Sequence, residues 1–252
     1  KGALFMVVGI LDHETGTRDI RRLGGLMSIM PITFTIALIG SMSMAGLPPF
    51  NGFLSKEMFF TGMLQASEVN FFSLDGLTIL FPIIAWVASV FTFLYCFILL
   101  VRPFFGKFKP DKLPKEKIHE APFGMLVPPI ILGSLVVLIF FFPNLLGHYI
   151  LKPALAAVVP SMQIGEIPYE ISAWHGFQPE LWMTIGVIFF GLVLFFAIKK
   201  WNIAFRFYPD KWSLNHLYHA GIENFEKKSV SITNSYMTGS IRHYLIYIFL
   251  FV

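Results

Sequence analysis

Three uncharged apolar runs constrain this fold more than any other feature of the sequence. They cover about residues 77–101, 123–142 and 181–198. Each is close to the length of roughly 20 residues with which an α-helix crosses a lipid bilayer. The strands of a membrane barrel alternate apolar and polar residues, so unbroken apolar runs indicate helices. We therefore expect an all-α integral membrane protein, built as a polytopic bundle of transmembrane helices.

The composition agrees with this expectation and excludes other classes. Of the 252 residues, 56% are hydrophobic and only 13% are charged, and the mean hydropathy is +0.69. A soluble domain of this size does not bury so much apolar surface. The net charge of +4 does not indicate nucleic-acid binding, because the basic residues cluster between apolar runs as membrane topology requires. The single cysteine, Cys96, lies inside an apolar run, and we expect it to pack in the core.

Shorter apolar stretches complete the predicted set of spans. We place further spans at 31–47 and at about 50–66, and partial spans at 1–11 and 244–252. The two terminal stretches are too short to cross a bilayer. We therefore expect the chain to be a piece of a longer membrane protein.

The distribution of basic residues gives a first topology. If every run crosses, segments 102–122 and 199–242 lie on one side and hold most of the 19 lysines and arginines. The positive-inside rule makes that side cytoplasmic and places segment 12–30 opposite. If residues 50–101 cross only once, as a broken helix, segment 12–30 changes side. The charge distribution does not decide between the two arrangements.

A cluster of helix breakers lies where a continuous helix would be expected. The stretch reads Gly-Leu-Pro-Pro-Phe-Asn-Gly-Phe-Leu-Ser-Lys-Glu from Gly46 to Glu57. Pro48 and Pro49 lack the N–H that a helix needs, and Gly46 and Gly52 adopt unusual dihedral angles easily. These residues predict a discontinuous helix. Irregular backbone at membrane depth is tolerated only where protein or water covers it, so we expect a polar cavity there.

The ionisable residues beside this break are candidates for a proton path. Lys56 would lie at membrane depth, where ionisable side chains are costly and commonly functional; the alternative is a lysine that snorkels to an interface. Glu57 points about 100° away from Lys56 on a helix, and is either a second titrating group or part of a structural salt bridge. Lys1 becomes a second buried lysine if the preceding chain continues its helix.

Small polar residues near the break are candidates for holding ordered water. They are also common packing residues between membrane helices. They are Ser41, Ser43, Asn51, Ser55 and Thr61.

Other chemistry has weaker support. Four histidines lie in predicted loops or near span ends, where a solvated or capping role is expected; they are His13, His148, His175 and His219. The sequence contains no metal-ligand motif, nucleophile elbow or phosphate-binding glycine loop. We therefore expect no metal and no cofactor.

A different pattern follows residue 213. Apolar residues recur there at spacings of three and four, which places them on one face of a helix; they are Leu214, Leu217, Tyr218, Gly221, Ile222 and Phe225. We expect an amphipathic interfacial helix within 213–240, lying along the membrane or against another protein of a complex. The alternative is a solvated loop helix.

Several of these motifs occur in one order in a known family. Lys1 to Phe5, the segment from Arg18 to Leu26, and the stretch from Gly46 to Glu57 resemble the antiporter-like subunits of respiratory complex I and of the Mrp Na⁺/H⁺ antiporters. Segment 13–20 and the Trp174 to Phe177 segment are more similar to the A-type subunits of the Mrp antiporters. The resemblance is strong to about residue 106 and weaker, but collinear, beyond it.

The resemblance implies roles for the candidate residues. In this family a lysine at the position of Lys1 belongs to a central line of lysines, and one at Lys56 lies on a discontinuous helix that ends a proton path. It implies a second half-channel in 1–122, further transmembrane helices in 123–198 with an interfacial loop at 143–180, and a cytoplasmic-side amphipathic helix with the start of the next span in 199–252. The family's first half-channel lies upstream of Lys1.

The expected function is proton translocation within a multisubunit Na⁺/H⁺ antiporter of the bacterial plasma membrane. The partners implied are other membrane subunits, the lipid bilayer, protons and Na⁺, with no nucleic acid. Such a protein is part of a secondary transporter and is not an enzyme. The alternatives are a proton-pumping subunit of a complex I-type NADH:quinone oxidoreductase, a structural membrane subunit without an ion path, and a gated channel.

Overall fold

The computed structural model describes residues 1–66, 78–108, 113–114, 118–158, 171, 176–205, 213–237 and 239–251. The regular structure of these residues is helical. The chain divides into two compact units, Lys1–Phe196 and Ala197–Val252, which we describe separately.

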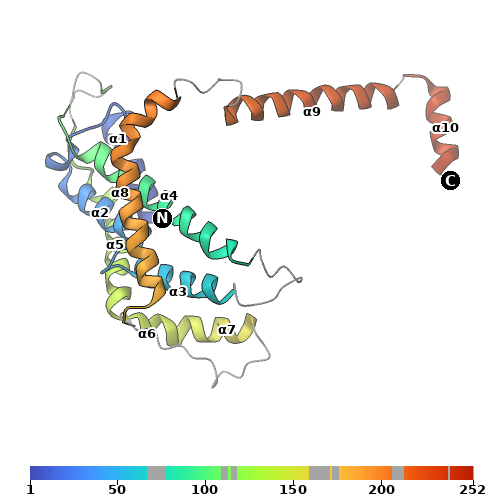
Figure 1. The fold of residues 1–252 in the computed structure, drawn as a ribbon. Helices are drawn as coiled ribbons and strands as arrows, with labels where there is room; N and C mark the ends of the chain where they lie inside the picture. The colour runs from blue at the N-terminus through green and yellow to red at the C-terminus, as the bar shows by residue number, and fades with distance from the viewer. Residues whose placement is uncertain are drawn as a thin grey trace. The chain divides into compact units, whose positions relative to one another are not determined.

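The first unit contains the long apolar runs (Figure 1). Its elements are α1 (Gly2–Thr15), η1 (Leu26–Ser28), α2 (Pro31–Ala45), α3 (Asn51–Ala66), α4 (Leu80–Phe104), α5 (Phe123–Phe141), α6 (Pro143–Leu146), η3 (Gly147–Leu151), α7 (Lys152–Val158) and α8 (Pro179–Phe205), whose last turns belong to the second unit. Among the residues that the structure describes, three segments are long and apolar enough to cross a membrane: Leu80–Phe104, Phe123–Phe141 and Pro179–Ile198. They coincide with the three runs from which the membrane fold was predicted.

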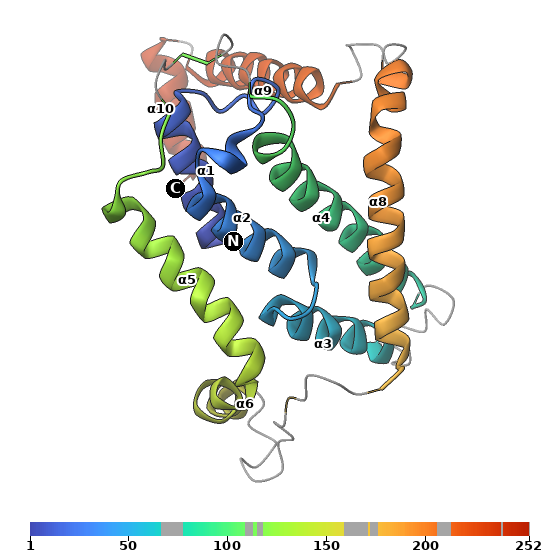
Figure 2. The same ribbon diagram turned by 90° about the vertical axis from the view of Figure 1, so that its left-hand side faces the viewer.

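Side-chain contacts fix the directions of the helices around α4. Trp86 Nε1 donates a hydrogen bond to the Met183 carbonyl oxygen at 3.0 Å, and the rings of Phe97 and Phe195 are 4.8 Å apart. Residue numbers therefore rise in the same direction along α4 and α8, so the two helices are parallel. Figure 2 shows them side by side.

The helix α2 runs antiparallel to α4. Just before α2, the Gly25 N–H donates to the Phe105 carbonyl oxygen at 3.2 Å, at the end of α4. Near the end of α2, Tyr95 Oη contacts Met44 Sδ at 3.6 Å, close to the middle of α4. Beyond α2, Phe60 of α3 packs with residues of the first half of α4. The helices α2 and α3 thus line different halves of α4.

This arrangement resolves the topology that the charge distribution left open. Segment 12–30 and the two ends of segment 105–122 lie at one end of the bundle, because Gly25 bonds to Phe105 and the buried carboxylate of Glu14 contacts His119 at 3.3 Å. Of the two arrangements left open, the structure agrees with the one in which residues 50–101 cross only once, because only α4 in that range returns along the full bundle. Segment 12–30 then lies on the same side as the two ends of segment 105–122.

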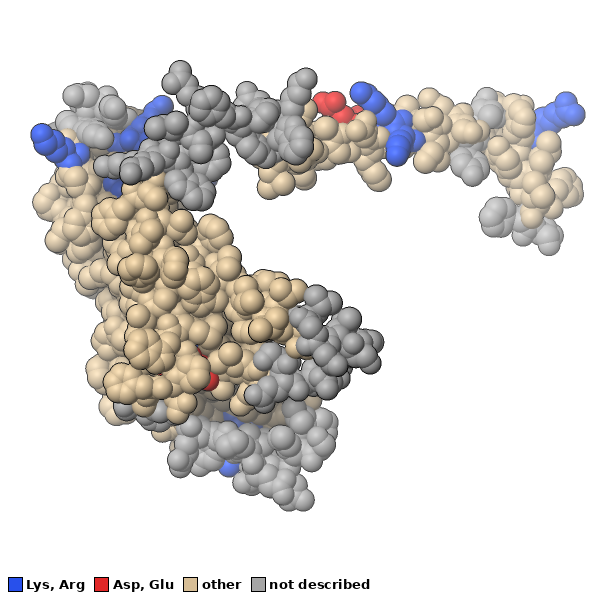
Figure 3. Space-filling model, in the orientation of Figure 1, with Lys and Arg blue, Asp and Glu red and all other residues tan. Residues whose placement is uncertain are grey.

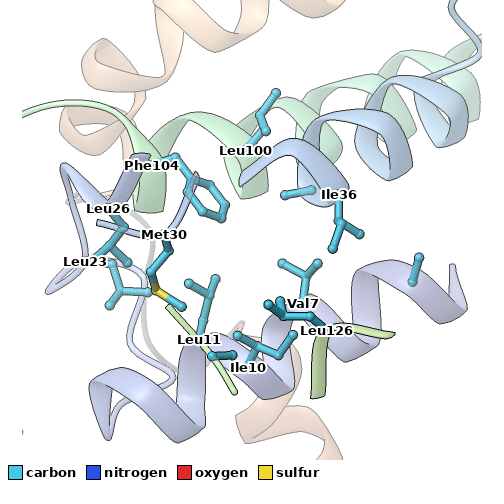
Figure 4. Packing of buried hydrophobic residues seen from close by; sticks show 13 residues of the cluster. Val7, Ile10, Leu11, Leu23, Leu26, Met30, Ile36, Leu100, Phe104 and Leu126 are labelled. Carbon is cyan, nitrogen blue, oxygen red and sulfur yellow. The ribbon is translucent and has the colours of Figure 1, made fainter. Parts of the chain in front are cut away.

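Two apolar clusters hold the first unit together. One lies at the end of the bundle where α1 ends and α2 begins, and Figure 4 shows its side chains directed toward a common space. Its labelled members are Val7, Ile10, Leu11, Leu23, Leu26, Met30, Ile36, Leu100, Phe104 and Leu126. The other surrounds the end of α2 and joins it to α3, α4 and α8; its buried members are Ala45, Phe60, Ala85, Val90, Phe93, Cys96 and Val187. The buried position of Cys96 agrees with the packing role expected for it.

The outer surface of this unit is apolar. Large side chains such as Ile84, Phe189 and Phe196 are 60 to 73% exposed, and the face drawn in Figure 3 is almost free of charge between its two ends. Such a continuous apolar surface is unusual for a soluble monomer and suits contact with lipid. The chain is a multi-pass, all-helical membrane protein.

The second unit contains α9 (Leu214–Tyr236) and α10 (Ile241–Phe251). At the start of α9, Ser213 Oγ accepts a hydrogen bond from the His216 N–H at 3.2 Å, as a helix-capping serine does. A helix therefore occupies most of the 213–240 segment, although its position along a membrane stays a prediction. Gly239, with φ of 70°, lies in the turn that leads to α10.

Candidate functional site

The candidate site is the interruption between α2 and α3. The helix α2 ends at Ala45, and Gly46 adopts φ of 80° while its N–H bonds back to the last turn of α2. The chain then passes through Pro48 and Pro49, whose peptide bond is cis, and α3 begins at Asn51. The interruption lies within the 46–57 stretch singled out in the sequence.

The interruption lies about halfway along α4. Ala45 and the α4 residues Phe93, Cys96 and Phe97 line one small cavity, and Leu80–Phe104 is long enough to cross a bilayer. Phe93 is close to the centre of that range, and Cys96 and Phe97 lie about one turn beyond it. The end of α2 is therefore near the middle of the apolar bundle, where bulk water does not satisfy its terminal carbonyl groups.

Lys56 supplies a partner for one of these carbonyls. Its Nζ donates a hydrogen bond to the Ala45 carbonyl oxygen at 2.8 Å, and the side chain is half-buried. The C-terminal end of a helix carries partial negative charge, which favours a cation at this position. The ammonium group is therefore directed to the end of α2, in the interior of the first unit.

The aliphatic stem of Lys56 reaches Ala45 across Gly46. A Cβ atom added to Gly46 would overlap the Cδ atom of Lys56. The positive φ of Gly46 is also one that other residues rarely adopt. The backbone therefore selects glycine at this position, and a larger residue would also displace the Lys56 side chain that packs on it.

A second contact closes the break from the α3 side. Ser43 Oγ donates to Asn51 Oδ1 at 3.0 Å and accepts a hydrogen bond from the Gly52 N–H at 3.2 Å. A Cβ atom on Gly52 would overlap the Ser43 carbonyl oxygen. The start of α3 therefore approaches α2 so closely that only glycine fits. The side chains of Ser43 and Asn51 are therefore hydrogen-bonded to each other.

The other candidates occupy distinct places. Glu57 is buried, 8% exposed, and makes an interaction of its own, while Ser55 is exposed. Ser41 is 2% exposed on α2. Thr61 Oγ1 donates to the Glu57 carbonyl oxygen at 3.1 Å, so this hydroxyl is satisfied by its own helix.

Lys1 lies at the start of α1 and is exposed. The next turn packs into the bundle, because Leu4 lies directly on Gly40 of α2.

A second polar cluster joins three segments at the end of the bundle away from the break. Glu14, whose side chain is 3% exposed, contacts His13 Nδ1 at 2.9 Å and His119 Nδ1 at 3.3 Å. The carboxylate of Glu120 accepts hydrogen bonds from the Ile32 N–H at 2.8 Å and from Thr33 Oγ1 at 2.5 Å. His13 thus pairs with a buried carboxylate, although its own side chain is 59% exposed.

Sequence reasoning missed Glu14, His119 and Glu120. Glu120 accepts a hydrogen bond from Ile32, in the first turn of a helix that begins with a proline, but the two residues are 88 positions apart in the sequence. No local sequence pattern therefore links them. The remaining histidines add little: His219 is exposed on α9, His148 makes an interaction of its own, and His175 lies outside the described residues. No group of three or more metal-ligating side chains is present among the residues that the structure describes.

The charged loop before α2 is organised by its own ion pairs. Arg18 Nε and Asp12 Oδ2 are 2.8 Å apart, and Arg21 hydrogen-bonds to both carboxylate oxygens of Asp19. The hydrogen bonds from Arg21 lower the pKa of Asp19 to about 2. This carboxylate is therefore ionised throughout the physiological range, and it fixes the loop without taking part in proton exchange.

Comparison with known proteins decides the family. The family described as "NADH:quinone oxidoreductase/Mrp antiporter, TM" matches residues 1–81. The A-type subunit of the Na⁺/H⁺ antiporter of Bacillus subtilis is 52% identical over 251 residues, which is 99% of this chain and 31% of the relative. Its counterpart from Alkalihalophilus pseudofirmus is 52% identical over 254 residues, 100% of this chain and 31% of the relative.

This chain belongs to the family of A-type Mrp antiporter subunits. It spans about a third of the length of the curated family members it matches. Among solved structures, the Mrp complex from Dietzia sp. superposes with a TM-score of 0.69 at 28% identity, over 98% of this chain and 25% of that chain. The archaeal membrane-bound sulfane sulfur reductase shares the fold, with a TM-score of 0.56 and 20% identity over 99% of this chain and 44% of that chain.

These findings confirm the family inferred from the motifs of the first segment and of the helix break. They also confirm that the family relationship extends past the region of strongest resemblance, because the identity to the A-type Mrp relatives covers the whole chain.

Proposed function

We propose that this chain forms part of the proton-translocating membrane subunit of a multisubunit Na⁺/H⁺ antiporter in a bacterial plasma membrane, and that Lys56 carries the proton at the helix break. The observation that carries the proposal is the hydrogen bond from Lys56 Nζ to the last carbonyl of α2. It places an ionisable group halfway along a helix that is long enough to span the bilayer.

The contact depends on the protonation state of the lysine. As an ammonium group, Lys56 interacts with both the Ala45 carbonyl and the negative end of α2. A neutral amine keeps only a weaker hydrogen bond. Loss of the proton therefore releases the side chain from the end of α2, and gain of a proton returns it. The helix break therefore binds the protonated form of Lys56 more tightly than the neutral form.

Lys1 is the second proton carrier in this proposal, and Glu57 is a second titrating group beside the break. Like charges repel each other, and the repulsion is stronger in a poorly screened protein interior than in water. A proton arriving at Lys1 would therefore favour release of the proton held at Lys56. Residues 1–122 form the second half-channel, and residues 123–198 are further transmembrane helices with an interfacial segment at 143–180.

The charged loops orient this half-channel. With segment 12–30 and the two ends of segment 105–122 at one end of the bundle, the positive-inside rule places that end in the cytoplasm. In residues 199–252, α9 lies along the cytoplasmic membrane surface with its exposed apolar residues, such as Leu217 and Phe225, toward lipid or a neighbouring membrane protein of the complex. The partners are the other subunits of the antiporter, the bilayer, H⁺ and Na⁺.

The decisive experiment measures sodium-dependent proton flux in inverted membrane vesicles that carry the full complex. Lys56→Ala is expected to lower the flux about a hundredfold, at the lower end of what a positioned proton-transfer group contributes. Lys107→Ala, which removes an exposed lysine of the same protein, is the matched control and is expected to leave the flux unchanged. Protein levels in the vesicles are matched by immunoblot.

Lys56→Arg separates proton transfer from capping of α2. Arginine keeps the positive charge at the helix end but does not release its proton in proteins. The proposal predicts an assembled and inactive complex for this variant. Wild-type flux in Lys56→Arg would show that the lysine serves only as a structural cap, as expected of a membrane subunit without an ion path.

The same vesicles test the redox-driven alternative. The antiporter proposal predicts sodium-dependent proton flux in vesicles that contain neither NADH nor quinone substrate. A flux that requires electron transfer would instead favour a complex I-type pump. A proton flux that does not depend on Na⁺ would favour a channel.

A further inference from the structure

A buried carboxylate at the end of α1 is contacted by imidazoles from two different segments. The side chain of Glu14 is 3% exposed; His13 Nδ1 lies 2.9 Å from its Oε1 atom, and His119 Nδ1 lies 3.3 Å from its Oε2 atom. A carboxylate removed from water is costly unless it is paired and hydrogen-bonded. The compensation of Glu14 therefore depends on two side chains of the type that changes charge between about pH 5 and 8.

His119 joins this carboxylate to the backbone of the next residue. Its Nδ1 atom is 2.8 Å from the carbonyl oxygen of Glu120. A carbonyl oxygen only accepts hydrogen bonds, so Nδ1 carries a hydrogen atom whether or not the ring is charged. The proton that His119 gains or loses is therefore the one at Nε2. The side chain is 70% exposed, so the ring exchanges this proton with solvent.

The same short segment holds the start of α2. The Glu120 carboxylate accepts hydrogen bonds from the Ile32 N–H and from Thr33 Oγ1, and Ile118 packs against the apolar cluster at this end of the bundle. Residues 118–122 therefore connect the end of α1, through His119, with the first turn of α2, through Glu120.

The other charged groups at this end do not replace the histidines. Among the residues that the structure describes, the ion pairs of Glu14 are those with His13 and His119, and the first turns of α2 and α5 contain no charged residue. The remaining charged side chains described there are paired with one another or exposed to solvent; they are Asp12, Arg18, Asp19, Arg21, Arg22, Arg102 and Lys107.

Protonation changes the strength of the contact between His119 and Glu14. A hydrogen bond between charged groups is roughly twice as strong as one between neutral groups. The charged imidazole balances the buried carboxylate, whereas the neutral imidazole keeps its hydrogen bond to the Glu120 carbonyl and leaves the carboxylate less compensated. The attachment of residues 118–122 to α1 therefore weakens as the pH rises.

We propose that His13, Glu14 and His119 form a pH-dependent clamp that holds residues 118–122, and with them the Glu120 cap, across the end of α1 and the start of α2. The clamp is firm toward about pH 5 and loosens toward about pH 8. Loosening it releases the start of α2, the helix whose last carbonyl receives Lys56. The clamp stands on the contacts themselves, whereas its response to cytoplasmic pH and its effect on transport rest on the proposed function.

The first test is hydrogen exchange, measured by mass spectrometry on the full-length protein in its purified complex, with labelling times scaled for the effect of pH on intrinsic exchange. We expect the first turn of α2 to lose about fivefold in protection between pH 6 and pH 8, the difference between a charged and a neutral hydrogen bond. His119→Gln keeps a side-chain N–H donor but cannot become charged. It is expected to show the lower protection at both pH values.

Two further variants complete this experiment. Glu14→Gln removes the charge that the imidazoles balance and is expected to abolish the pH response. His219→Gln, at an exposed position on α9, is the matched control and is expected to respond as the wild type does. Equal protection of the wild type at pH 6 and pH 8 would overturn the clamp. An undiminished pH response in His119→Gln would also overturn it.

The second test is sodium-dependent proton flux in inverted vesicles with the outer solution, which replaces the cytoplasm, at pH 6 or pH 8. His119→Gln is expected to have about fivefold less flux than the wild type at pH 6 and nearly equal flux at pH 8. The same ratio at both pH values would refute the regulatory effect of the clamp. Wild-type flux in Lys56→Arg would instead refute the proposed function, and hydrogen exchange alone would then decide the clamp.

Discussion

Single glycines control the close approach of α2 and α3. Gly52 and Gly62 lie on the same helix, but a Cβ atom on Gly52 would overlap the Ser43 carbonyl, whereas one on Gly62 would meet nothing within 4 Å. The obstacle at Gly52 is backbone, which has no alternative rotamer. The start of α3 therefore has to move away from α2 before any larger residue fits.

Gly52→Ala is expected to destabilise the full-length protein by about 1–3 kcal/mol, the usual effect of overpacking, and to lower antiport because Lys56 is displaced from Ala45. Gly62→Ala, the control, is expected to be neutral or slightly stabilising because alanine favours a helix over glycine. Thermal unfolding in detergent and vesicle flux measure the two effects. Equal behaviour of the two variants would show that the contact between Gly52 and Ser43 does not constrain the break.

At the scale of single residues, the sequence predicted which positions form the break better than it predicted which atoms they contact. The breakers at Gly46 and Gly52 and the lysine at 56 were identified from residue type alone. The hydrogen bond to Ala45 was not predictable, because a backbone carbonyl leaves no signature in the sequence.

Among the elements, α2 is held at both ends by side chains from elsewhere in the chain. Glu120 accepts hydrogen bonds from the first turn, at Ile32 and Thr33, and Lys56 donates to the last carbonyl, at Ala45. An anion at the start and a cation at the end of a helix both interact favourably with its dipole. The depth of the Ala45 carbonyl in the bundle is therefore fixed from both directions.

Glu120→Ala is expected to lower the stability by about 1–2 kcal/mol, as loss of a helix N-cap does. A lower melting temperature is therefore expected, measured on purified full-length protein. Glu226→Ala on α9, where the side chain is exposed, is the matched control. An unchanged melting temperature for Glu120→Ala would contradict the capping role.

At the scale of the whole molecule, the arrangement of α2, α3 and α4 decides which loops share a side. Composition and unbroken apolar runs predicted the membrane fold and all three long spans, because burial in lipid depends on averages over many residues. The side of segment 12–30 depends on whether α3 crosses separately, and neither hydropathy nor charge distinguishes a broken helix from two short ones. Contacts between distant segments, such as the hydrogen bond from Gly25 to Phe105, are needed to assign segment 12–30 to one side.

The topology is testable with single cysteines in a full-length protein made otherwise cysteine-free. Arg18→Cys and Lys107→Cys are expected to react with a membrane-impermeant maleimide from the same, cytoplasmic side. Tyr149→Cys, an exposed position beyond the other end of α5, is expected to react only from the opposite side. Labelling of Arg18→Cys and Tyr149→Cys from one side would contradict the shared end of segments 12–30 and 105–122.

The position of the break halfway along α4 has an electrical consequence. A full crossing of the membrane changes the energy of a unit charge by about 2.3 kcal/mol for each 100 mV of membrane potential. A proton held at Lys56 has crossed about half of that field, so about 1.2 kcal/mol of each 100 mV acts on its arrival and the remainder on its departure. Voltage would then bias both the loading and the unloading of this lysine, and neither step would be electrically silent.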